Sequence, residues 1–266
     1  MSHSFDLYMP GHSWLHRMDP RTKLWAVLLA GVTGLIFKDL VVLSMLVLLT
    51  QIVLLTAHIP VRHIRWLWIR LIPLLLLILI LQPLFAPGPG PDLLALGPVR
   101  LTVEGILEGV SFALRAAALT FVAAILLLTT EPTLLVQGLV KLGLPYPWGL
   151  TAGLAIRYLP TMYGLFGTIS EAQQARGWIV GQGNLVGRVR SYVPILVATV
   201  IAALRLSDNL GMALAARGLG YQSQRTVLHD VYFAPADWLV TALDTGVFAA
   251  LLALRFGLGF GAAPWT

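Results

Sequence analysis

Long apolar stretches dominate this sequence, and residues 74–81 are wholly aliphatic. Of its 266 residues, 58% are hydrophobic and 11% are charged, whereas a soluble domain usually carries about 25% charged residues. Helices satisfy their own backbone hydrogen bonds without water, so they are the structure that such stretches can adopt in lipid. We therefore predict an all-α integral membrane protein.

Charged residues and helix breakers divide the apolar sequence into about five expected spans. The first, Leu24–Phe37, is short against the roughly 20 residues that a spanning helix needs, and Asp19-Pro20 is a typical helix start. Only Lys38-Asp39 separates it from the second span, which indicates a tight hairpin. The expected spans are 24–37, 40–57, 69–85, 105–129 and 237–258.

Two further apolar segments are ambiguous. Trp148–Ile169 is interrupted by Arg157 and Pro160, and Tyr192–Leu204 has a proline near its start. Basic loops follow both segments, and cytoplasmic loops are the ones that collect Lys and Arg. We predict that neither segment fully crosses the bilayer and that both are long, slanted helices at the cytoplasmic boundary.

These expectations divide the chain into three parts. Residues 1–129 form an N-terminal segment and four transmembrane helices, residues 130–230 form a cytoplasmic or interfacial coupling domain, and residues 231–266 hold the last transmembrane helix. The cations Arg17, Arg21 and Lys23 precede the first span, which predicts a cytoplasmic N-terminus. The expected location is a prokaryotic cell membrane, crossed several times.

Several classes of function lack their signatures. The chain has no cysteine, no nucleotide-binding loop and no HExxH or GxSxG motif. Its carboxylates are scattered, and His58 and His63 do not share a helical face. The net charge of +6 is expected in loops at the membrane rather than at a nucleic acid. We predict no catalytic, cofactor or metal site, and no nucleic-acid partner.

Arg115 is a separate candidate because it falls inside an expected span. A charged residue within the membrane is a functional candidate by default. Two structural interpretations remain open for it: snorkelling to the interface, and an ion pair with Glu108 on the same helical face.

A repeated tripeptide is the feature most suggestive of function. Ala175-Arg176-Gly177 recurs as Ala216-Arg217-Gly218, each copy at the end of a helix-permissive stretch. A single copy is an ordinary helix end with a glycine cap. Two copies offer two permanently charged, planar sets of donors for carboxylates, and their small flanking residues allow close approach to a groove.

The twin motif resembles the coupling motifs of the transmembrane (T) component of energy-coupling factor (ECF) transporters. The phrase Ser13-x-Leu-His-Arg-x-Asp-Pro-Arg-Thr-Lys23 is similar to the N-terminal signature of this family. Matching mid-chain patterns are Thr130-x-Pro132, Leu142-Gly-Leu-Pro145 and Arg157-Tyr-Leu-Pro160. The resemblance covers most of residues 13–225.

The resemblance implies a non-catalytic subunit that joins two cytosolic ABC-type ATPases, or two copies of one, to a membrane S component that binds a vitamin or a metal ion. Arg176 and Arg217 would each dock on one ATPase. Two alternatives stay open from the residues alone: a self-contained secondary transporter, which predicts inverted repeats, and a membrane-embedded enzyme acting on lipid. The transported substrate and the number of S components served do not follow from this chain.

Overall fold

The computed structural model describes residues 8–11, 13–85, 92–96, 99–178, 181, 184–220 and 233–258. The chain divides into two compact units. Residues 6–144 and 231–266 form one, called here the bundle, and residues 1–5 and 145–230 form the other, called the helix pair.

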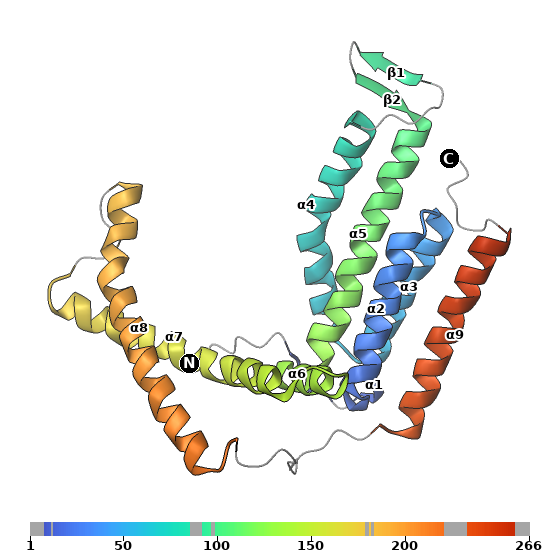
Figure 1. The fold of residues 1–266 in the computed structure, drawn as a ribbon. Coiled ribbons are helices and arrows are strands. Elements are labelled where there is room, and N and C mark those ends of the chain that lie inside the picture. The colour runs from blue at the N-terminus through green and yellow to red at the C-terminus, as the bar shows by residue number, and fades with distance from the viewer. Residues whose placement is uncertain are drawn as a thin grey trace. The chain divides into compact units, whose positions relative to one another are not determined.

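The bundle is built from helices of very different length (Figure 1). In chain order its elements are α1 (Trp14–Arg17), α2 (Pro20–Ile36), α3 (Leu40–Thr56), α4 (Val61–Phe85), β1 (Asp92–Leu96), β2 (Val99–Thr102), α5 (Val103–Thr129), α6 (Pro132–Lys141) and α9 (Pro235–Leu258). The helix pair consists of α7 (Tyr146–Ala175) and α8 (Leu185–Ala216).

Helix α5 forms the centre of the bundle, where it packs against α2, α3 and α4. Its residues Ala117, Ala118 and Phe121 are almost fully buried. The alanines let neighbouring helices approach closely, as small residues do in membrane proteins. The ring of Phe121 lies 4.9 Å from the ring of Trp68 on α4, within the range of favourable aromatic pairs.

Side-chain caps fix where the bundle helices start. The Asp19 carboxylate accepts a hydrogen bond from the Arg21 backbone N–H at 2.8 Å, and Asp39 accepts one from Val41 at the same distance. Pro20 occupies the first turn of α2. The predicted Asp-Pro helix start and the tight turn between the first two apolar runs are therefore confirmed.

The all-α membrane fold is confirmed. Among the described helices, four are long and apolar enough to cross a membrane: α4, α5, Val186–Ala216 of α8 and Pro235–Gly257 of α9; α3 is a shorter apolar helix. The predicted count of about five included 24–37 and left out 192–204. Residues 192–204 lie within one continuous helix that runs through Pro194, in agreement with the long helix predicted for them.

The segment between α4 and α5, which is rich in proline and glycine, contains a small β-hairpin. Strands β1 and β2 pair antiparallel, with Leu96 opposite Val99. Residues 86–91, which hold most of those prolines, lie outside the described part. The hairpin lies beyond the helical body of the bundle (Figure 1).

Candidate functional site

Both copies of the repeated tripeptide end a long helix. Helix α7 ends at Ala175 and α8 at Ala216, and the arginine that follows is the C-cap in each case. Backbone angles at the two caps nearly coincide, with φ −82° and ψ 7° at Arg176 and φ −86° and ψ 9° at Arg217. The repeat in sequence is thus a repeat in conformation.

The glycines explain why these helices stop. Gly177 has a φ of +83° and Gly218 a φ of +78°, in the left-handed region that glycine adopts without steric cost. At the α7 end, the N–H of Trp178 donates to the Gln173 carbonyl at 3.0 Å, and that of Gly177 donates to Gln174 at 2.9 Å. These two hydrogen bonds, one nested inside the other, form a Schellman motif.

The α8 end closes in the same way. The N–H of Leu219 donates to the Leu214 carbonyl at 3.0 Å, and the N–H of Gly218 donates to Ala215 at 2.9 Å. Both motifs satisfy helix carbonyls that would otherwise lack partners. Each arginine therefore projects from a defined helix end.

Both arginines are available to a partner. Ala175, Arg176 and Gly177 are all exposed, as are the three residues of the second copy. Within the described part of the chain, neither guanidinium has an ion pair. A cation at a helix C-terminus is favoured by the helix dipole, by about 0.3–1 kcal/mol. That stabilisation leaves the side-chain donors free.

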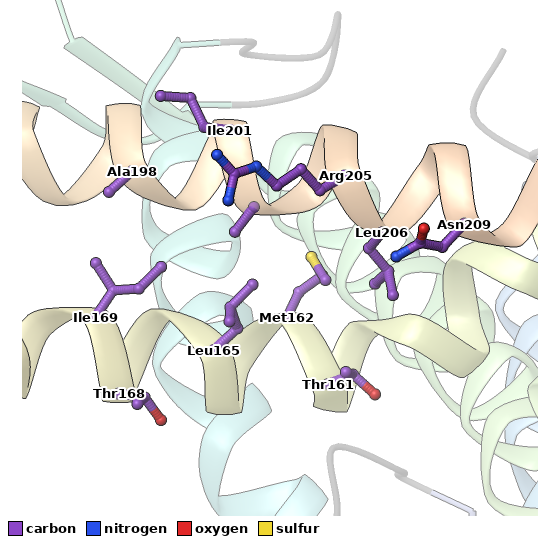
Figure 2. A pocket seen from close by; sticks show the side chains of 11 residues that line it. Thr161, Met162, Leu165, Thr168, Ile169, Ala198, Ile201, Arg205, Leu206 and Asn209 are labelled. Atoms are coloured by element: carbon purple, nitrogen blue, oxygen red, sulfur yellow. The ribbon is translucent and has the colours of Figure 1, made fainter.

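The two helices carrying the arginines run in opposite directions along a shared groove of about 770 Å³. Figure 2 shows Ile169 of α7 opposite Ala198 of α8, and Leu206 of α8 pointing toward α7 beside Met162. Each helix end lies about 10 Å beyond the last groove residue of its own helix, at 1.5 Å per residue. The arginines therefore extend past opposite ends of the groove.

Trp178 fastens the first of these ends to α8, a role that sequence reasoning missed. Its indole N–H donates to the Ser191 carbonyl at 2.7 Å. The Ser191 hydroxyl in turn accepts from the Gly181 N–H at 3.0 Å and donates to the Arg188 carbonyl at 2.7 Å. Ser191 is buried, and Ile195, one turn further along α8, is fully buried. The sequence feature that could have indicated this contact is the tryptophan that directly follows Arg176-Gly177.

The N-terminal phrase Asp19–Lys23 forms a junction inside the bundle. Lys23 is buried, and its ammonium group donates to the Thr129 carbonyl and to the Thr130 hydroxyl, both at 3.0 Å. Burial lowers the pKa of Lys23 to about 8, while the charges of Asp237 and Asp19 act in the opposite direction. Lys23 thus links the start of α2 to the end of α5.

Asp237 extends this junction to the last helix. It accepts a hydrogen bond from the Asp19 backbone N–H at 3.2 Å and one from the Ala234 N–H at 3.0 Å. Nearby, Thr22 is almost fully buried. The N-terminal phrase therefore holds together α2, α5 and α9, three helices that are distant in sequence.

Arg115 contacts the end of α2 and, within the described part of the chain, makes no ion pair with Glu108. Its guanidinium donates to the Phe37 carbonyl at 3.1 Å and lies 5.0 Å from the centre of the Phe112 ring. On the same helix, the Ser111 hydroxyl donates to the Lys38 carbonyl at 2.7 Å. Both side chains of α5 thus bind the end of α2.

Among the described residues, no group of three His, Asp or Glu side chains is placed to hold a metal ion.

Comparison with known proteins identifies similar chains. Residues 11–227 match the CbiQ family, described as cobalt transport protein. The ECF transporter transmembrane protein EcfT of Acidaminococcus fermentans is 32% identical over 94% of this chain and 96% of its own length. The EcfT of Heliobacterium modesticaldum is 34% identical, over 91% of this chain and 93% of its own.

A third similar protein is larger. A putative ABC transporter ATP-binding protein of Bifidobacterium longum is 32% identical to this chain. The match covers 92% of this chain but only 32% of the Bifidobacterium protein.

Proposed function

The chain belongs to the family of transmembrane components of ECF transporters, and on this premise we propose that it couples two cytosolic ABC ATPases to uptake through a membrane S component. In this proposal Arg176 and Arg217 each bind acidic residues in a groove on one ATPase, and Ala175, Gly177, Ala216 and Gly218 permit the close approach. The ATPases are two subunits or two copies of one. The substrate is a vitamin or a transition-metal ion held by the S component.

The observation that carries the proposal is the structural identity of the two arginine ends. Two copies of one docking element suit a motor made of two similar subunits. A helix end is stiff, so a push on one arginine is transmitted along α7 or α8 to the groove that both helices line. When the ATPases close on ATP, the two ends would move together, and the helix pair would pass that motion to the S component.

The protein from Bifidobacterium longum supports the choice of an ATPase as the partner. A segment similar to this chain makes up about a third of a protein whose name is that of an ATP-binding protein. Covalent fusion of such a segment to an ATP-binding protein is what a permanent functional partnership would produce. ATP hydrolysis would then reside in the partner and not in this chain.

The charge distribution in the bundle supports a cytoplasmic N-terminus. The bond between Lys23 and Thr129 places the start of α2 and the end of α5 at one end, opposite the hairpin (Figure 1). The cations of that end are Arg17, Arg21, Lys23, Arg62, Arg65 and Lys141, and its acids are Asp19, Glu131 and Asp237. An excess of cations marks the cytoplasmic side. The segments that carry the arginine motifs are also rich in arginine, including Arg188, Arg190 and Arg205, so we infer that both motifs are cytoplasmic as well, within a coupling domain of residues 130–230.

Co-purification tests the proposal directly. The chain, carrying an affinity tag, is extracted from its native membrane in mild detergent, and the proteins that accompany it are identified. The proposal predicts ABC-type ATPase subunits in near-stoichiometric amount together with a small membrane protein. Recovery of the chain with no ATPase subunit, under conditions in which the S component is retained, would contradict it.

A further inference from the structure

The first turns of α4 carry a row of exposed cations that the coupling function does not use. Arg62, Arg65 and Arg70 are exposed, as are Trp66 and Ile69 between them. Their spacing places all five on one face of the helix. The opposite face, with Ile64 and Leu71 buried, packs into the bundle core.

Arg70 bends back toward the charged end of this row. Its guanidinium lies 5.0 Å from the centre of the Trp66 ring, one turn nearer the start of the helix. Long cationic side chains near the ends of membrane helices take this direction to reach the interface, and a tryptophan beside them is typical of the headgroup layer. Among the described residues, none of the three arginines has an ion pair.

The same face continues as an apolar stripe. Ile72, Leu76 and Ile80 are exposed along it, in a helix long and apolar enough to cross a membrane. This exposed face is cationic over its first turns and aliphatic thereafter. It is therefore complementary to an amphiphilic molecule that has an anionic group at one end and hydrocarbon chains at the other.

We propose that this face of α4 binds an anionic phospholipid. Arg62, Arg65 and Arg70 bind the headgroup phosphate and its additional negative charge, Trp66 lies at the glycerol level, and the acyl chains lie along Ile69, Ile72 and Leu76. A cation near the membrane surface favours anionic lipid by about fivefold in affinity, so three cations together contribute on the order of a hundredfold.

The test uses the purified full-length chain in detergent, titrated with phosphatidylglycerol or phosphatidylcholine, with bound lipids counted by native mass spectrometry. The variant Arg62→Gln/Arg65→Gln/Arg70→Gln removes the cations. The control Arg17→Gln/Arg188→Gln/Arg190→Gln removes the same charge from exposed arginines elsewhere. Circular dichroism and gel filtration establish that both variants fold, and the single variant Arg62→Gln serves if the triple variant does not.

The wild type should bind phosphatidylglycerol more tightly than phosphatidylcholine. The affinity for phosphatidylglycerol should fall on the order of a hundredfold in the triple α4 variant and about fivefold in the single variant Arg62→Gln. The control should keep its affinity, and inorganic phosphate at the same concentration should not displace the lipid, because phosphate lacks the acyl chains. Equal losses in variant and control, no preference in the wild type, or displacement by phosphate would each overturn the proposal.

Discussion

Arg176 and Arg217 occupy the same C-cap position on two antiparallel helices, and each precedes a left-handed glycine that closes the same pair of backbone hydrogen bonds. Because the backbone on both sides of each arginine is fixed, the two side chains leave their helices in equivalent directions relative to the local axis. The chain therefore presents the same arginine-bearing helix end twice.

Replacing Gly177 or Gly218 with alanine should destabilise the helix end that it closes. A side chain in the left-handed region costs about 1–2 kcal/mol, and a Cβ at either position would meet no other group within 4 Å, so the effect is one of backbone strain. Thermal unfolding in detergent should show a lower transition temperature for each variant, and the affinity for the ATPases should fall.

Gly164→Ala is the matched control for this prediction. Gly164 lies within α7, and its added Cβ would also meet nothing within 4 Å, but its backbone is helical. Alanine is favoured over glycine there by about 1 kcal/mol. A transition temperature for Gly177→Ala as high as that for Gly164→Ala would show that the left-handed conformation does not matter.

Replacing Trp178 with phenylalanine should loosen the end of α7, which carries Arg176, from α8. The change keeps an aromatic ring but removes the N–H that donates to Ser191 at 2.7 Å, and loss of such a bond costs about 1 kcal/mol. Hydrogen exchange at residues 176–181 should become faster, while exchange at the end of α8, around Arg217, stays unchanged.

Trp148→Phe provides the comparison for Trp178→Phe. Trp148 lies in the same helix pair and is 69% exposed. Its substitution should leave exchange at residues 176–181 as in the wild type. Equally faster exchange at residues 176–181 in both variants would contradict the role of Trp178 in holding this helix end to α8.

Stability of the bundle should depend on pH through Lys23. Its folded-state pKa is about 8, below the ordinary lysine value of 10.5, so the unfolded chain binds the proton more tightly. The free energy of unfolding therefore rises with pH between about 8 and 10.5, and below pH 8 this gain is absent. From pH 7 to pH 9.5 the gain amounts to about 2 kcal/mol.

Lys23→Met identifies this contribution, because the variant cannot titrate at the same site. The change in unfolding free energy between pH 7 and pH 9.5 should be smaller in the variant than in the wild type. Chemical denaturation of both proteins in detergent at the two pH values gives the comparison. Identical pH dependence would contradict the assignment to Lys23.

Single cysteines test the orientation, since the chain contains none of its own. A cysteine at position 176 or 217 should react with a membrane-impermeant maleimide only in inverted vesicles. A cysteine replacing the exposed Lys38, in the turn at the hairpin end of the bundle, should react in intact cells. Labelling of position 176 from outside the cell would refute the cytoplasmic placement.

The sequence predicted features that depend on short-range chemistry. Asp19-Pro20 marks a helix start because the carboxylate caps the backbone of its own first turn. Arg-Gly marks a helix end because glycine alone enters the left-handed region without cost. The membrane fold followed from composition. These inferences needed no knowledge of what lies elsewhere in the chain.

Features that depend on distant contacts were not predictable in this way. Lys23 reaches Thr129 and Thr130 from more than a hundred positions away in sequence, and Arg115 binds the carbonyl of Phe37 rather than Glu108. Pro160 and Pro194 do not interrupt α7 and α8, so both segments are the long helices that were predicted. Membrane helices tolerate proline because neighbouring groups compensate for the freed carbonyl.

Uptake by the charge-reversed double variant Arg176→Glu/Arg217→Glu tests the coupling function most directly. The variant is expressed with the proposed ATPases and S component, and transport into cells is measured beside Arg188→Glu/Arg190→Glu, which reverses two exposed charges on the same helix pair. A glutamate facing an acidic groove opposes binding by several kcal/mol. If the two arginines dock the ATPases, the first variant should insert normally but show no uptake and no ATPase association, and the second should retain uptake. Normal transport by Arg176→Glu/Arg217→Glu would contradict this docking role.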